Sequence, residues 1–179
     1  MTRATRTAAQ IALLALAGCS ELCGLAVGGM AADEEVAAHR FRGVAASTLW
    51  PIVREEVRRN ESTAVLPEAA PPLNEWAATE WTTMNDAEDR RLRARLSSDD
   101  GGASIHVEVE AESRSKASPD GPTTSLGAQT TTLLAVIERG DPAGYTAMSQ
   151  RIAERGTSAQ SGCRCVEEQF PVNPAPGSR

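Results

Sequence analysis

The chain has few residues of several kinds, and each shortage removes a class of function. Its 179 residues include three tryptophans, two phenylalanines, one tyrosine and two histidines, and Lys116 is the one lysine among 18 basic residues. So few aromatic side chains predict a modest core, built mainly from leucine, valine and isoleucine. The sequence contains no nucleophile-elbow serine motif, no phosphate-binding glycine loop and no cluster of histidines. It therefore offers no catalytic constellation.

The chain also lacks a hydrophobic run long enough to cross a bilayer. A membrane-spanning helix needs about 20 apolar residues, and the apolar run at 11–17 ends before Ser20. A second apolar stretch, at 22–32, is equally short and is interrupted by glycines. Neither stretch is predicted to span a membrane.

The N-terminus does contain the parts of an export signal. Arg3 and Arg6 precede the apolar run, and small residues follow it. The sequence Leu16-Ala17-Gly18-Cys19 resembles the lipobox of bacterial lipoproteins. This resemblance implies cleavage before Cys19 and acylation of its thiol and amine, so that lipid anchors the mature protein to a membrane. In this family an aspartate directly after the cysteine signals retention in the inner membrane. Here Ser20 takes that position, so by the same resemblance the expected location is the periplasmic face of the outer membrane.

Net charge limits the partners of the mature chain. Cleavage removes two of the 18 basic residues, so 16 remain against 24 acidic residues and the formal net charge becomes −8. This acidic balance argues against nucleic acid as a partner and against adhesion to anionic lipid head groups through charge. The expected partners are the membrane, through the lipid on Cys19, and other envelope proteins.

Three further cysteines have no assigned role. Cys23, Cys163 and Cys165 form an odd set in an oxidising compartment. One residue separates Cys163 from Cys165, which is shorter than the usual zinc-knuckle spacing, and no histidine lies nearby. A disulfide between the tail and Cys23, a bridge within the pair, free thiols and redox use of the pair all stay open. No metal ligand, cofactor or catalytic residue is assigned.

Composition divides the chain into four parts. Residues 1–18 are the signal peptide, and residues 19–39 are expected to be a lipidated N-terminus and flexible tether because they are rich in glycine and alanine. Residues 40–156 carry the hydrophobic patterns of a folded domain. Residues 157–179 are expected to be a disordered tail, since serine, glycine, proline and charge dominate there.

Several elements are predicted within the folded domain. A helix is expected to begin at a Thr48 cap and to run to about Asn60, with four apolar side chains on one face: Leu49, Trp50, Val53 and Val57. Strands are expected at 40–44, 62–66 and 76–84. Two more helices are expected at 126–140 and 142–156.

Two alternating segments give the clearest pattern. Residues 90–96 alternate leucine or alanine with arginine, and residues 104–112 alternate apolar residues with histidine and glutamate. A two-residue turn at Asp100-Gly101 predicts a hairpin in which Leu96 faces Ile105 and Arg93 faces Glu108. The charged face is expected to be solvated, and a docking strip for an acidic partner is the alternative.

The predicted elements form an α+β fold, a two-layer sandwich in which helices cover an antiparallel sheet of four or five strands. Leu49-Trp50-Pro51, Thr79-Glu80-Trp81 and the arginine-rich strand resemble the helix-grip domain of accessory lipoproteins of the outer-membrane β-barrel assembly machinery. The resemblance implies a helix laid across the sheet and a role in protein–protein contact. It transfers no functional residue.

Three functions are consistent with these observations. The leading hypothesis is a non-enzymatic lipoprotein whose domain binds other envelope proteins, in outer-membrane assembly or maintenance. The second is a lipid or small-ligand carrier, which requires a hollow space between helix and sheet. The third is a thiol redox protein that uses Cys163 and Cys165.

Overall fold

The fold is known from a computed structural model, and the structure describes residues 24–98 and 103–162. These residues belong to two compact units. Ala32–Ser149 forms one unit, and the other joins residues 24–31 to residues 150–162. The lipobox and all four cysteines lie outside the described residues.

Two long antiparallel strands form the centre of the sheet. They are β4 (Glu88–Ser97) and β5 (Ser104–Ser115). Two short strands, β2 (Ala77–Ala78) and β3 (Thr82–Thr83), pair one after the other with the outer edge of β4. Likewise β1 (Phe41–Arg42) and β6 (Thr124–Ala128) pair with opposite ends of the outer edge of β5. All pairs are antiparallel. Because two short strands share each outer edge, the sheet is four strands wide although six strands contribute to it.

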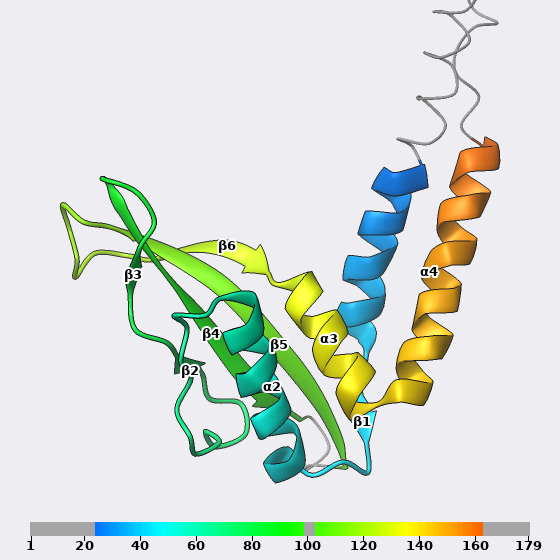
Figure 1. The fold of residues 1–179 in the computed structure, drawn as a ribbon, viewed down its shortest axis with the longest axis horizontal. Coiled ribbons are helices and arrows are strands. Elements are labelled where there is room, and N and C mark those ends of the chain that lie inside the picture. Colours follow the sequence, from blue (N-terminus) through cyan, green and yellow to red (C-terminus); the bar gives the residue numbers. More distant parts are fainter. Residues whose placement is uncertain (1–23, 99–102, 163–179) are drawn as a thin grey trace, which may run out of the picture. The chain divides into compact units, whose positions relative to one another are not determined.

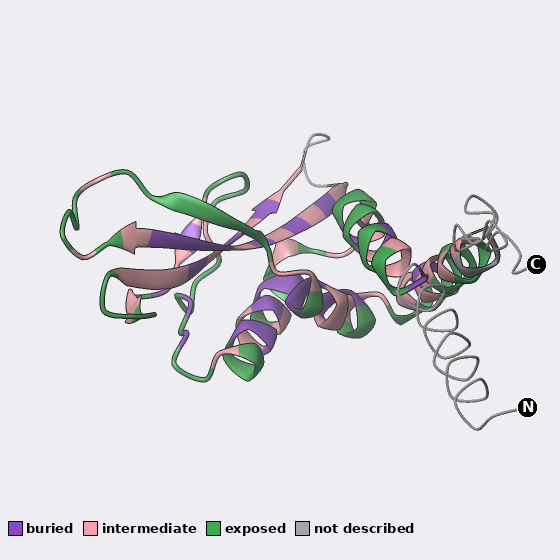
Figure 2. Ribbon diagram, turned by 90° about the horizontal axis from the view of Figure 1, so that it is seen from above, coloured by how far each residue is buried: buried purple, intermediate pink, exposed green. Residues whose placement is uncertain are grey.

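Helices α2 (Ala46–Asn60) and α3 (Thr130–Gly140) cover one face of this sheet (Figure 1). The apolar residues alternate along β4 and β5, so they share the face that the helices cover, and they are buried. Bands of buried and half-buried residues mark this alternation along the ribbon (Figure 2). The α+β two-layer sandwich expected from the sequence is therefore confirmed. Its sheet has six strands where four or five were expected, because two edges are each shared by a pair of short strands.

The space between α2 and the sheet is filled. The apolar face expected for α2 is confirmed, since Leu49, Trp50, Val53 and Val57 are all at most 1% exposed. Side chains from the two long strands meet them from below, including Leu92, Leu96, Ile105 and Val109. The indole Nε1 of Trp50 donates a hydrogen bond to the Pro67 carbonyl oxygen at 3.0 Å, which satisfies its polar atom at the core margin.

Polar contacts also join the two helices. Arg139 of α3 forms an ion pair with Glu56 of α2, a carboxylate that is only 5% exposed. Asn60 at the end of α2 donates to the hydroxyl of Thr132 in α3. These contacts fix α2 and α3 to each other at both ends of their interface.

The far end of the β4–β5 hairpin is closed by hydrogen bonds. Asn85 accepts the backbone N–H groups of Ala87 and Glu88 on its side-chain oxygen, at 2.8 and 2.9 Å. The ammonium group of Lys116 donates to the Asn85 carbonyl oxygen at 2.7 Å and lies 3.8 Å from the Asp89 carboxylate. The turn before β4 is thus fixed to the end of β5.

The register predicted for the hairpin was wrong by two residues. Leu96 pairs with Val107 rather than Ile105, and Arg93 pairs with Glu110 rather than Glu108. A shift of two keeps every side chain on its expected face. The observed register opposes Arg95 to Glu108, whereas the predicted register would have opposed it to His106. Arg95 therefore gains a carboxylate partner that it would lack with a two-residue turn at Asp100-Gly101.

Several predicted boundaries were also wrong. Helix α2 begins at Ala46 without a side-chain cap, so Thr48 lies inside its first turn and Pro51 falls in the second. Residues 62–66 form no strand, and residues 76–84 form only β2 and β3. Residues 124–128, expected in part as helix, form β6, because Gly127 takes a φ of 92° and Gln129 donates to the Val109 carbonyl.

The structure also differs from the predicted tether and tail. Residues 24–38 are helical, although glycine and alanine predicted a flexible segment over 19–39. Helix α4 (Pro142–Gly162) starts at the expected proline but continues through Gly156 to the last described residue. The larger unit, Ala32–Ser149, starts and ends a few residues before the domain expected over 40–156. None of the described helices is both long enough and apolar enough to cross a bilayer.

Gly140 provides a test of how closely α3 packs. A Cβ at this position would lie 2.8 Å from Cε1 of Phe41 and 3.1 Å from Cδ2 of Leu49, and both side chains are buried. Because neither can move aside, Gly140→Ala is expected to lower the free energy of unfolding by about 1–3 kcal/mol. Urea denaturation followed by tryptophan fluorescence measures this loss.

The same substitution at Gly29 is the control. No atom lies within 4 Å of a Cβ at that helical position, so alanine adds only its higher helix propensity, worth up to about 1 kcal/mol. A Gly140→Ala midpoint equal to that of Gly29→Ala would contradict the close approach described above.

Candidate functional site

The face of the sheet opposite the helices is charged. Three arginines of β4 alternate with its buried residues, and each faces a glutamate of β5: Arg91 and Glu112, Arg93 and Glu110, Arg95 and Glu108. The pairs are ionic as well as adjacent, with 2.8 Å between Arg93 Nη2 and Glu110 Oε2 and 3.0 Å between Arg95 Nη2 and Glu108 Oε1. Three parallel guanidinium–carboxylate pairs therefore cross the strand boundary.

Two tryptophans lie against these arginines. The guanidinium carbons of Arg93 and Arg95 lie 4.3 and 4.6 Å from the ring centroid of Trp76. Those of Arg91 and Arg114 each lie 4.4 Å from the centroid of Trp81. Contacts of this kind contribute about 0.5–1 kcal/mol each when exposed and more when desolvated. Arg114 also pairs with Asp89. We call these four residues of β4 and four of β5, with the two tryptophans, the arginine–tryptophan layer; it comprises Trp76, Trp81, Asp89, Arg91, Arg93, Arg95, Glu108, Glu110, Glu112 and Arg114.

The solvated face predicted from the sequence is therefore wrong. All ten members of the arginine–tryptophan layer are half-buried or buried. The contact of both Trp76 and Trp81 with the arginines was not predicted, because residues five positions apart point to opposite faces of one regular strand. The break between β2 and β3 brings both indoles to the arginine face. Only the coincidence of two tryptophans with an arginine-rich strand hints at this in the sequence.

Glu112 is the most deeply buried charged residue of the layer, at 2% exposure. Its Oε1 accepts from Arg91 Nε, and its Oε2 lies 3.3 Å from Arg93 Nη1 and accepts from the Thr123 hydroxyl at 3.2 Å. Both oxygens are thus satisfied by groups from β4 and from the loop before β6. These partners take the place of water around a carboxylate that is almost without exposure.

The charge state of the outermost pair is fixed in the same way. Partial burial acts to raise the pKa of the Glu108 carboxyl, but the hydrogen bond and charge of Arg95 outweigh it, and the pKa lies below its usual value. The hydrogen bond from Arg95 to Glu108 in turn raises the pKa of the arginine. Neither group is available as a proton donor or acceptor near neutral pH.

Both histidines of the chain lie near the start of β1. Burial lowers the pKa of His106, and the positive charge of Arg40 lowers it further. A hydrogen bond with the His39 carbonyl acts to raise this pKa but does not outweigh burial. His106 Nδ1 lies 2.9 Å from the Arg40 guanidinium and 3.1 Å from the His39 carbonyl oxygen, to which Arg40 also donates. His39 packs edge-on to Phe41 and lies 3.5 Å from Asp141. His39 is therefore part of the fold, although it is the last residue of the stretch that was expected to be a flexible tether.

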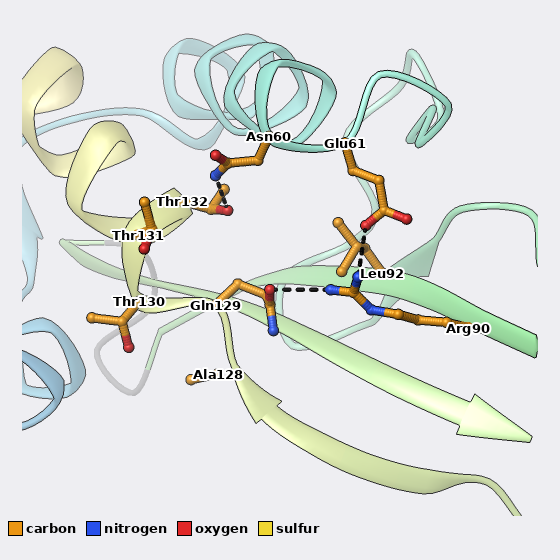
Figure 3. A pocket seen from close by; sticks show the side chains of 9 residues that line it. All are labelled: Asn60, Glu61, Arg90, Leu92, Ala128, Gln129, Thr130, Thr131 and Thr132. Carbon is orange, nitrogen blue, oxygen red and sulfur yellow. Dashed lines mark hydrogen bonds and ion pairs between the residues drawn. The ribbon is translucent and has the colours of Figure 1, made fainter. Parts of the chain in front are cut away.

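A polar cleft lies on the helix side of the sheet (Figure 3). Its volume is about 650 Å³, within the range of small-molecule sites. The end of α2, the start of β4 and the junction between β6 and α3 line it, with these residues: Asn60, Glu61, Arg90, Leu92, Ala128, Gln129, Thr130, Thr131 and Thr132.

The charged groups of this cleft already bind one another. Arg90 lies 3.4 Å from the Glu61 carboxylate and donates to the Gln129 side-chain oxygen at 3.3 Å (Figure 3). Asn60 is bound to Thr132. A ligand that entered would have to displace one of these contacts, so the cleft has the groups of a polar binding site in a closed, self-paired state.

The site residues predicted from the sequence cannot be compared with this geometry. Cys19, Cys23, Cys163 and Cys165 all lie outside the described residues. Among residues 24–98 and 103–162, no group of three or more histidine, cysteine, aspartate or glutamate side chains could hold a metal ion. Comparison with known proteins adds no relative, because no family model, no curated protein and no solved structure matches the chain.

The burial of Glu112 leads to a stability prediction. Glu112→Gln removes the carboxylate that pairs with Arg91 and one of the two carboxylates that pair with Arg93, which keeps Glu110. Because both arginines are about 30% exposed and can regain some water, the expected loss is about 1–3 kcal/mol of unfolding free energy, less than for a fully buried pair. Chemical denaturation at neutral pH measures it.

Glu55→Gln is the matched control. Glu55 binds Arg58 and Arg59 on the outer surface of α2, where solvent screens the charges. This variant is expected to unfold at the same denaturant concentration as the parent chain. Equal effects of the two substitutions would mean that Glu112 is not the central group of the layer.

Proposed function

We propose that this protein is an envelope lipoprotein, anchored at the periplasmic face of the outer membrane through lipid on Cys19, whose folded unit binds other envelope proteins. One observation carries the proposal: Leu16-Ala17-Gly18-Cys19 follows a basic start and an apolar run in the order of a lipoprotein signal. The apolar run is too short to act as a spanning helix, so the lipid would be the attachment.

The folded unit supports a binding role because its surface is held rigidly. Its sheet is fixed by the helices on one face and by the arginine–tryptophan layer on the other. Preformed surfaces lose little conformational entropy when a partner docks, which favours stable contact. Assembly or maintenance of the outer membrane is the setting that we propose for this contact.

A carrier of apolar ligands has less support from the geometry. Such a carrier needs an open space between helix and sheet, and here Trp50, Val53 and Leu96 fill that space without exposure above 1%. The polar cleft beside Arg90 is a separate feature and suits polar groups. Redox use of Cys163 and Cys165 concerns residues that lie outside the described part of the chain.

The anchor is tested by substitution of the acylated cysteine. Cys19→Ala is expected to abolish incorporation of labelled palmitate and to move the protein from the membrane fraction to the soluble fraction of the cell. Metabolic labelling followed by fractionation measures both effects. Unchanged labelling and unchanged membrane association would overturn the proposal.

Cys23→Ala is the control for that experiment. Cys23 lies four positions from Cys19 in the same stretch of sequence, but it does not follow a lipobox. This variant is expected to keep both the label and the membrane fraction. If Cys23→Ala lost the label instead, the modified cysteine would have been assigned wrongly.

The binding role is tested by recovery of a partner after cross-linking in living cells. Purification of the tagged lipoprotein from detergent-solubilised membranes is expected to recover the same envelope protein in replicate experiments. An unrelated domain joined to residues 1–39 controls for neighbours that share only the membrane. Recovery of the same proteins with both baits, or of none, would contradict a binding role for the folded unit.

A further inference from the structure

An apolar face is exposed on the helix over residues 24–38. In residues 24–31 the exposed positions are Leu25, Ala26, Gly29 and Met30, and none carries a charge. Positions i, i+1, i+4 and i+5 lie on one side of a helix. Leu25 is 72% exposed and Met30 59%, which places them among the most exposed large apolar side chains of the described residues.

The opposite side of this helix is already occupied. Gly24 and Ala31 are buried. A Cβ at Gly156 of α4 would lie 3.5 Å from the Gly24 carbonyl oxygen and 4.0 Å from the Gly28 Cα, so the two helical segments of this unit approach closely there. The partner helix therefore covers the small residues and leaves the side with the two large apolar residues open.

Charge changes abruptly along the same stretch. No charged residue occurs between Glu21 and Asp33, and Asp33, Glu34 and Glu35 then follow in succession. The exposed face is thus apolar over residues 24–31 and acidic beyond them. A helix divided in this way suits a boundary between an apolar phase at its start and water further along.

The distance to the anchor matches this boundary. Leu25 is six residues after Cys19, and a fully extended chain covers at most about 3.6 Å per residue, or about 20 Å in all. This length is less than the hydrocarbon thickness of a bilayer, about 30 Å. Acyl chains on Cys19 would consequently hold Leu25 and Met30 within reach of the membrane surface.

We propose that the face formed by Leu25, Ala26, Gly29 and Met30 lies in the membrane interface beside the acyl chains of Cys19. The occupant of this face is thus lipid. The inference rests on the proposed lipid anchor. Its driving force is burial of apolar area, because the acidic residues that follow are repelled by anionic head groups and stay in the water.

The test uses a tryptophan as a depth probe in the lipidated mature protein. Leu25→Trp is reconstituted into phosphatidylcholine vesicles with and without bromine atoms on the acyl chains, since bromine quenches nearby indoles. The added emission is expected to be blue-shifted and largely lost in brominated vesicles. The parent protein, with Trp50, Trp76 and Trp81 in its folded unit, supplies the background to be subtracted.

Val65→Trp is the matched control. Val65 is an apolar side chain of similar exposure, 63%, but it belongs to the other unit and lies 40 residues further along the chain than Leu25. Its added emission is expected to be unchanged by bromine. Equal quenching at both positions would overturn the inference, because it would mean general adhesion to the vesicle.

Flotation of the same vesicles separates the two proposals. If the lipidated chains do not float with the vesicles, the anchor itself fails. If they float and the Leu25→Trp emission stays unquenched, the anchor stands and the interfacial face is overturned. A photo-cross-linker at position 25 that joins a second copy or another protein, instead of lipid, overturns it as well.

Discussion

The ion-paired carboxylate of Glu112 is the interaction on which the arrangement of the sheet depends. It lies in the middle of β5, almost without exposure, and binds the guanidinium groups of Arg91 and Arg93. Those arginines in turn contact Trp81 and Trp76, which come from the segment along the outer edge of β4. A chain with six aromatic residues cannot build a second hydrophobic core. It covers the second face of its sheet with stacked, paired charges instead, which leaves that face of the hairpin half-buried.

This layer also shows where reasoning from sequence succeeds and where it fails. Period-two alternation identified β4 and β5, and period-3.6 spacing identified the buried face of α2, because both patterns are local. The register depended on a turn and on the number of arginine–glutamate pairs, and the turn rule chose the wrong one by two residues. The position of Trp81 depended on a break between β2 and β3 that no propensity marks. The polar cleft could not be foreseen, since Asn60, Arg90 and Gln129 meet only after the chain has folded.

The two sides of the sheet differ in how their polar groups are used. On the helix side, Arg90 bridges Glu61 and Gln129 at the mouth of a cleft, and these contacts are part-exposed and can be exchanged. On the other side, Arg93 and Glu110 are held between neighbouring pairs and an indole ring. Contacts of the first kind exchange with water more readily, whereas those of the second kind are held by several neighbours at once.

The single lysine has a practical consequence. Lys116 lies beside the turn at the far end of the hairpin, where its ammonium group donates to the carbonyl of Asn85. If the amine of Cys19 is acylated, this ε-amino group is the one primary amine left in the mature chain. Amine-directed reagents would then attach at one known point. A fluorophore or a cross-linker placed there reports on the end of the hairpin that lies away from the loop joining β4 to β5. Few proteins allow such single-site chemistry without a change to their sequence.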